Sequence, residues 1–284
     1  MRYTDQFAVF ILSHGRADRI KTIKALENGN YTGRIFIVID NEDETAPGYY
    51  ARYGNQVLMF DKLDMARRFD TADNFSERRT IVYARNACFE LAEKLGLTYF
   101  LELDDDYTVF HFRRIVDHKF IQIECQQLDR LFDAMIDFLE ASNAQTVALA
   151  QGGDFIGGKD SGNFKKGILR KAMNTFFCTT KRPFQFVGRV NEDVNTYTWL
   201  GSRGELLMTV TAASINQTPT QANKGGMTEQ YLDSGTYLKS FYTVMFMPSA
   251  VKISQMGQTY KRIHHHVLWN NCVPKILPEK HKKI

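Results

Sequence analysis

The sequence predicts an α/β fold in which helices cover a mostly parallel sheet. Short runs of consecutive apolar residues, typical of strands buried on both faces, occur at Phe7–Leu12 and Arg34–Asp40. Between such runs lie segments with apolar residues at helical spacing, of which residues 80–94 are the clearest. Alternation of strands and helices with short connections favours parallel strands with helices on both faces of the sheet.

The other elements of the first half follow the same alternation. A helix is expected over residues 17–27, because Asn28-Gly29 supplies a stop. Val57–Phe60 is predicted as a short third strand. Residues 98–103 are predicted as a strand that begins after the helix stop at Gly96.

The second half is less regular, and we expect a mixed region there. The predicted elements are a helix over 126–141, strands at 147–150, 174–179 and 206–212, and a helix that begins near Asn191. Glycine-bearing polar segments at 152–171 and 218–226 indicate loops, and the basic tail from Lys275 indicates a frayed end.

Composition and charge narrow the class of protein. Apolar residues make up 44% of the 284 residues, which is enough for a sizeable core, and no apolar run approaches the ~18 residues of a membrane helix. The net charge of +4 is compatible with nucleic acid as a partner but does not require it. The four cysteines lack CxxC spacing, which indicates reduced thiols and a cytoplasmic protein. Oligomeric state leaves no signal in the sequence.

Three consecutive carboxylates, Asp104, Asp105 and Asp106, follow the predicted strand at 98–103. Ligands of open parallel sheets bind beyond the carboxyl ends of the strands, where these side chains are expected. Adjacent carboxylates repel one another, and Mg²⁺ or Mn²⁺ compensates them through hard oxygen ligands. The pattern therefore predicts a metal site that bridges a diphosphate. An exposed acidic turn is the alternative interpretation.

The run ARNAC at residues 84–88, followed by LELDDD at 101–106, resembles the GT-A glycosyltransferases, especially the inverting family-2 type. In those enzymes such a helix precedes a strand that ends in a DxD motif. The segment Ser13-His14-Gly15-Arg16 and the strand end at Asp40 resemble their nucleotide-binding segments. The resemblance covers residues 7–110.

The resemblance implies a Rossmann-like GT-A sheet in a single domain over residues 1–284. Residues 1–110 would bind the nucleotide sugar, with a UDP-sugar as the usual donor, and residues 111–284 would bind the acceptor and end in the basic tail. The residues implied at the donor are Ser13, His14, Arg16, Asp40, Arg85, Asn86, Asp104 and Asp105. Arg85 or Asn86 is expected beside the diphosphate or the ribose. Asp106 is expected to be the main ligand of Mn²⁺ or Mg²⁺, with Asp104 on the metal or the ribose.

Two further features gain a role from the same resemblance. Glu192-Asp193 resembles the acidic pair that supplies the catalytic base of inverting enzymes; Asp193 is our first choice and Glu192 the second. Helix capping is the alternative, because acidic side chains favour the first helical turn. Among His264, His265 and His266, a histidine that completes the metal shell is implied, with His266 favoured; a polar surface run is the alternative.

The acceptor is indicated by a second, shorter resemblance. The stretch 269–275 is similar to phage glycosyltransferases that accompany DNA-base hydroxylases and glycosylate hydroxymethylated pyrimidines in DNA. Basic side chains could bind phosphates, and they are Lys165, Lys166, Arg170, Lys171, Lys181 and Arg182. Phe184, Phe186 or Tyr197 could stack on a flipped base. A surface glycan or a protein is the alternative acceptor. A non-catalytic nucleotide-sugar- or DNA-binding protein is the alternative from another class.

Overall fold

A computed structural model describes residues 1–76, 78–117, 119–155, 158–160, 174–217, 238–256, 262–272 and 279. Within this part of the chain the main sheet has nine strands in the order β3-β2-β1-β4-β8-β7-β9-β5-β6. They are β1 (Phe7–Leu12), β2 (Arg34–Asp40), β3 (Val57–Phe60), β4 (Tyr99–Asp104), β5 (Tyr107–Val116), β6 (Lys119–Glu124), β7 (Thr146–Gln151), β8 (Thr175–Thr179) and β9 (Leu207–Gln217). A separate antiparallel pair is formed by β10 (Val251–Met256) and β11 (Arg262–Val267).

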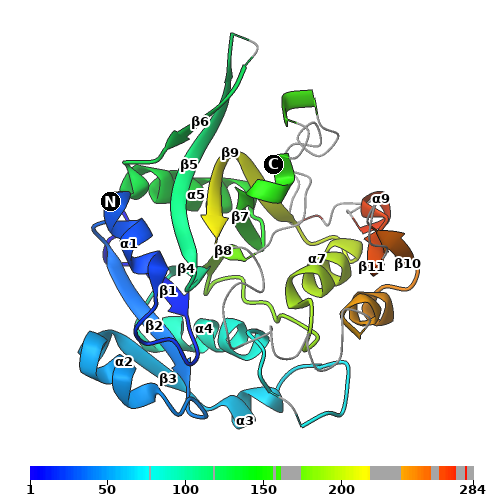
Figure 1. Ribbon diagram of the computed structural model, residues 1–284, viewed down its shortest axis with the longest axis horizontal. Coiled ribbons are helices and arrows are strands. Elements are labelled where there is room, and N and C mark those ends of the chain that lie inside the picture. Colours follow the sequence, from blue (N-terminus) through cyan, green and yellow to red (C-terminus); the bar gives the residue numbers. More distant parts are fainter. Residues whose placement is uncertain are drawn as a thin grey trace.

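Helices surround this sheet (Figure 1). They are α1 (Lys21–Asn28), α2 (Ala46–Tyr53), α3 (Lys62–Ala66), α4 (Val82–Lys94), α5 (Leu128–Ser142), α7 (Glu192–Ser202) and α9 (Trp269–Cys272), with a further helix over 238–246. Short 3-10 turns occur at η1 (Gly54–Gln56), η2 (Gly152–Phe155) and η3 (Gly158–Asp160). None of the helices in the described ranges is long and apolar enough to cross a membrane.

The sheet is parallel in one half and mixed in the other. β3, β2, β1 and β4 pair in parallel, as the alternation of strands and helices predicts. Beyond β4, β8 is antiparallel to both of its neighbours, and β5 is antiparallel to both β9 and β6. The expectation of a mostly parallel sheet therefore holds for the strands from β3 to β4 and for the β7–β9 pair, whereas the other four neighbouring pairs are antiparallel. A tight turn after β4 leads straight into β5, which crosses to the far side of the sheet and forms a hairpin with β6.

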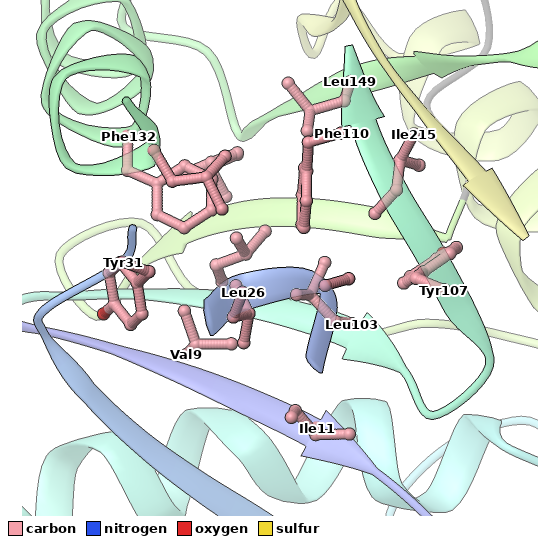
Figure 2. Packing of buried hydrophobic residues seen from close by; sticks show 14 of the residues in the cluster. Val9, Ile11, Leu26, Tyr31, Leu103, Tyr107, Phe110, Phe132, Leu149 and Ile215 are labelled. Atoms are coloured by element: carbon pink, nitrogen blue, oxygen red, sulfur yellow. The ribbon is translucent and has the colours of Figure 1, made fainter. Parts of the chain in front are cut away.

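Both faces of the parallel half are buried, as the continuous apolar runs predict. In β1, the side chains of Phe7, Val9 and Ile11 belong to a cluster that includes residues of α1, α2 and α5. The intervening residues of the same strand belong to a second cluster with α4, α7, β10 and β11. Figure 2 shows side chains of the first cluster, Leu26 and Phe132 among them, gathered against the strands. The four cysteines are free and buried.

Two predicted helix boundaries shift for identifiable reasons. The first helix begins at Lys21 rather than at residue 17, because the carbonyl of Asp105 accepts the N–H groups of Lys21 (2.9 Å) and Thr22 (3.4 Å). α4 begins at Val82 and is followed by Gly96 with φ of 68°, which confirms the predicted glycine stop. The β5–β6 hairpin and the elements α2, α3, β10 and β11 were not foreseen.

Replacement of Phe132 tests the core beneath α5. The ring is fully buried, with centroids 5.3 Å from Tyr31 and 5.5 Å from Phe177. We expect Phe132→Ala to lower the free energy of unfolding by about 3–5 kcal/mol in urea denaturation, because a cavity replaces these contacts. Ile115→Ala on the exposed hairpin is the matched control and should stay within ~0.5 kcal/mol. Equal losses in the two variants would contradict this assignment of the core.

Candidate active site

Three neighbouring strands end at one edge of the sheet. Leu12 at the end of β1 pairs with Val38 of β2 on one side and with Asp104 of β4 on the other. The strand order reverses between β1 and β4, since the chain proceeds outward from β1 to β3 and returns to β4. In open α/β sheets ligands bind at this switch point, beyond the carboxyl ends of the strands. The segments after β1 and β4, residues 13–16 and 104–106, therefore border the candidate site.

Asp105 connects these two segments. Its side chain is buried and accepts hydrogen bonds from Ser13 Oγ (2.7 Å) and Arg16 Nη1 (2.9 Å). Ser13 Oγ also shares a hydrogen bond with Tyr49 Oη (2.7 Å), and that oxygen accepts the N–H of Arg16 (2.9 Å). The structure thus brings Ser13, Arg16 and Asp105 together, and much of their hydrogen-bonding capacity is directed at one another.

Asp104 and Asp106 lie in a region of excess negative charge. Burial raises the pKa of Asp104 to about 7; repulsion from Asp106 and Glu192 adds to the shift, and Arg85 opposes it. Burial also raises the pKa of Asp106, together with repulsion from Asp105, whereas Arg16 and Lys21 lower it. Two carboxylates that are both driven toward the neutral form are suited to bind a cation.

A buried arginine joins Asp104 to distant elements. Arg85 of α4 is only 1% exposed. Its Nη2 donates to Asp104 Oδ1 (3.0 Å), its Nε to Glu192 Oε1 (3.1 Å) and its Nη1 to Glu102 Oε2 (3.4 Å). Burial alone would lower the pKa of the guanidinium, but the three carboxylates outweigh it and raise the pKa. The structure therefore buries Arg85 among three carboxylates at this edge, whereas the resemblance implies a place beside the diphosphate or the ribose.

Asn86 is also committed to the protein. Its Nδ2 donates to the carbonyl of Phe186 (3.0 Å), and its Oδ1 accepts the N–H of Phe186 (2.8 Å). This pair of bonds fixes the segment that precedes α7. Phe186 and Tyr197 are buried in the core, so the idea that they stack on a flipped base is wrong. Phe184 packs against Phe186, with ring centroids 5.0 Å apart.

The predicted Glu-Asp pair forms the first turn of α7. Gly188 (φ 81°) and Asn191 (φ 60°) adopt left-handed conformations that turn the chain into this helix. The carboxylate of Glu192 is turned to Arg85, and burial raises its pKa together with repulsion from Asp193. Asp193 is 9% exposed, and its Oδ1 accepts the N–H of Val194 (2.8 Å). The two adjacent acids therefore differ, because Glu192 is tied to the arginine and Asp193 is not.

Asp40 at the end of β2 anchors a histidine and a lysine. His14 Nδ1 donates to Asp40 Oδ2 (2.8 Å), Lys62 Nζ donates to the same oxygen (3.1 Å), and Asp40 Oδ1 accepts the N–H of Glu42 (3.1 Å). Burial would raise the pKa of Asp40, but the bond from His14 and the charge of Lys62 outweigh it and lower the pKa. The His14 side chain is 41% exposed and that of Asp40 only 6%, so His14 is the one that reaches the surface of this edge.

The histidine run lies on β11, and its strand conformation separates the three side chains. His265 is buried, and its Nδ1 lies 3.5 Å from Asn191 Nδ2, whereas His266 is exposed. The structure thus brings His265, not the predicted His266, beside the start of α7. In the part of the chain that is described, no group of three or more His, Cys, Asp or Glu side chains is close enough to hold a metal ion. The structure therefore does not bring His266 into one cluster with Asp104 and Asp106.

Sequence reasoning missed three residues of this edge. Tyr49 of α2 and Lys62 of α3 belong to no recognisable sequence motif. Tyr49 is 36 positions from its partner Ser13, and Lys62 is 22 positions from its partner Asp40. Glu102 did leave a signal, because it is a charged residue inside the apolar run of β4. Its side chain is fully buried, and burial raises its pKa to about 8.

An α/β sheet with acidic and basic side chains at the switch point is an arrangement typical of enzymes that bind ligands there. Residues 7–226 match the sequence model of the TET-Associated Glycosyltransferase family, and the chain belongs to this family. It is therefore a glycosyltransferase, as the resemblance in the sequence indicated.

Solved structures give only distant likenesses. A mycobacterial protein matches with a TM-score of 0.47 at 9% identity, covering 92% of this chain and 83% of its own. A mannose-1-phosphate geranyltransferase from Thermus thermophilus matches with a TM-score of 0.29 at 15% identity, covering 51% of this chain. This chain spans 41% of the length of the Thermus protein. No curated protein matches. These low TM-scores carry no argument about function.

The His14–Asp40 pair predicts a pH-dependent contribution to stability. The hydrogen bond to Asp40 raises the pKa of His14 above its usual 6.5, so folding favours the protonated ring. The stabilisation is fully present below about pH 6.5 and is lost as pH rises through the raised pKa. We expect the stability difference between the wild type and His14→Gln, at most ~1 kcal/mol for this partly exposed pair, to shrink between pH 6 and 9 in urea denaturation. A measured His14 pKa below the usual value would contradict the assignment.

Proposed function

We propose that the protein transfers a sugar from a nucleotide sugar, with uridine diphosphate as the carrier, to an acceptor hydroxyl on a GT-A type of scaffold with the help of a divalent cation. One observation carries the proposal. At the switch point of the sheet, the guanidinium of Arg85 is ion-paired both to Asp104 and to Glu192. Asp106 lies close enough to Asp104 to raise its pKa, and Asp193 follows Glu192 in the chain. Sugar transfer needs carboxylates of two kinds in one site. One kind binds the cation that meets the diphosphate of the donor, and the other accepts the proton of the acceptor hydroxyl.

The nucleotide is expected along the ends of β1 and β2. His14 is the most exposed of the polar side chains that the sequence indicates there, and its ring is oriented by Asp40. Ser13, Arg16 and Asp105 hold the segment after β1 against the end of β4. A pocket whose polar groups are pre-positioned by such bonds loses less entropy when the donor binds.

The residues suited to hold Mn²⁺ or Mg²⁺ are Asp104 and Asp106. Burial and repulsion from neighbouring carboxylates raise the pKa of both groups even though Arg85, Arg16 and Lys21 lie nearby, which fits a site with negative charge left for a cation. A cation held by these two carboxylates would supply positive charge to the leaving diphosphate.

Asp193 is the proposed base. Its Oδ2 would accept the proton of the acceptor hydroxyl while the oxygen attacks the anomeric carbon, and the bond from that carbon to the diphosphate breaks. The products are the glycosylated acceptor, the nucleoside diphosphate and a proton. A single displacement inverts the anomeric configuration. Glu192 is less suited, because its carboxylate is engaged by Arg85.

A hydroxymethylated pyrimidine in phage DNA is the proposed acceptor. The resemblance of residues 269–275 to phage enzymes supports it, and the description of the family as TET-associated fits glycosyltransferases that accompany base hydroxylases. The basic residues at 165–171, the loop at 218–226 and the tail from Lys275 (apart from Glu279) lie outside the described residues. The site of action would then be the host cytoplasm.

Mass spectrometry of candidate acceptors after incubation with a panel of nucleotide sugars tests the proposal. A hexose or pentose added to hydroxymethylcytosine or hydroxymethyluracil in duplex DNA is the expected product. Transfer to a glycan or protein alone would replace the DNA acceptor. Binding of DNA without transfer of any sugar would favour a non-catalytic protein. An electrophoretic shift with duplex DNA at two salt concentrations tests whether the protein binds DNA through its phosphates, because such binding weakens as salt rises.

Asp106→Asn tests the cation site. We expect turnover with Mn²⁺ to fall at least ~100-fold while the cooperative thermal unfolding is retained, because the amide lacks the charge that the cation requires. Asp64→Asn, on the exposed side of α3, is the matched control and should behave as the wild type. Full activity of the wild type in EDTA would remove the cation from the mechanism.

Asp193→Asn tests the base. Loss of a general base typically costs ~10²–10⁴-fold, and we expect this loss in kcat with the donor KM changed no more than a few-fold. If Asp193 only capped α7, the variant would lose ~0.3–1 kcal/mol of stability and keep its kcat.

A further inference from the structure

Arg85 has properties of a positioning group. It comes from the first turn of α4, and each nitrogen of its guanidinium is bonded to a different carboxylate. Two of these acids, Glu102 and Asp104, belong to β4, whereas Glu192 opens α7 and is 107 positions away. The guanidinium thus links the strand that carries the proposed cation ligands to the helix that carries the proposed base.

Aromatic rings and a backbone clamp fix the orientation of this guanidinium. The Arg85 Cζ lies 4.9 Å from the ring centroid of Phe176 and 5.8 Å from that of Phe186. The next residue, Asn86, holds the backbone of Phe186 through two hydrogen bonds. A planar, rigid fork held between aromatic rings keeps its three N–H directions constant, which the flexible ammonium of a lysine does not.

The Arg85–Glu192 bond also determines where Asp193 lies. Glu192 and Asp193 are consecutive residues of the first turn of α7, so a fixed Glu192 fixes the start of the helix. The neighbouring Asp193 keeps a carboxylate that Arg85 does not engage. A displacement of about 1 Å in a reacting group can cost ~100-fold in rate.

We infer that Arg85 is a positioning residue that sets the separation between Asp104 on β4 and Asp193 on α7, and thereby aligns the donor side of the site with the acceptor side. This inference rests on the proposed function. The arginine touches neither donor nor acceptor and acts through Asp104 and Glu192. A purely structural arginine would alter stability and leave the kcat of the folded enzyme unchanged.

Three variants and a control separate these roles. Arg85→Lys keeps the charge but not the three fixed donor directions. Glu192→Gln weakens only the connection to α7, and the double variant combines both changes. Arg34→Lys is the control, since Arg34 is a half-buried arginine at the opposite end of β2 from the candidate site, where its Nη2 donates to the carbonyl of Asp5 (2.7 Å). For each protein we would measure thermal unfolding, kcat and donor KM, and Mn²⁺ affinity by titration calorimetry without donor.

For Arg85→Lys we expect cooperative unfolding, a kcat lowered about 10–100-fold and a Mn²⁺ affinity lowered about 10-fold, because Asp104 loses its fixed partner. For Glu192→Gln we expect kcat to fall about 10-fold with Mn²⁺ affinity within ~2-fold of wild type, because the Arg85–Asp104 bond remains. The double variant should lose little more in kcat than Arg85→Lys alone, since both changes break one connection.

Wild-type kcat and Mn²⁺ affinity in Arg85→Lys, with only the unfolding temperature lowered, would overturn the inference. Independent, multiplicative losses in the double variant would overturn it as well. If Arg85→Lys does not fold, Glu192→Gln decides, and an unchanged kcat in that variant refutes the link to α7. Failure of the proposed function would show itself differently, as a wild type without sugar transfer, and the Mn²⁺ titrations would still test the arrangement of Asp104.

Discussion

The buried positive charge of Arg85 connects β4 to α7 at the candidate site. Removing a guanidinium from water is costly, and the cost is offset only when each of its nitrogens finds a well-placed acceptor. Arg85 meets that condition with three carboxylates from β4 and α7. Those acids depend on it in turn, because without Arg85 the buried Glu102, the partly buried Asp104 and Glu192 would repel one another. The charge is thus a constraint on three elements at once.

The sheet explains why these groups meet. Parallel pairing from β3 to β4 brings the ends of β1, β2 and β4 to one edge, and the reversal of strand order leaves room there for a ligand. The tight turn after β4 then sends β5 to the far side of the sheet, where it pairs with β9 and β6. Asp104 ends β4, and Asp105 and Asp106 form the turn before β5, so the three carboxylates are held between two strands and are not on a free loop.

The three aspartates of the triplet have different surroundings. Asp105 faces the segment after β1 and is bonded to Ser13 and Arg16, which makes it part of the scaffold. Asp104 accepts a hydrogen bond from Arg85. The pKa of Asp106 is raised by the charge of Asp105 and lowered by the charges of Arg16 and Lys21. One short acidic motif therefore supplies both a scaffold contact, through Asp105, and the two carboxylates proposed to bind the cation.

The sequence by itself determined the strands β1, β2 and β3 to the residue, the place of the acidic triplet after β4 and the acidic start of α7. The strands are indicated by runs of apolar residues, and the helix ends by glycine stops and acidic first turns. Such signals involve residues that are close together in the chain. Only the tertiary structure decided that Arg85 is buried, that Asn86 clamps Phe186 and that His265 approaches α7 in place of His266. The reason is physical: a charged side chain chooses its partner in space, and Glu192 is 107 positions from Arg85, beyond the reach of any local pattern.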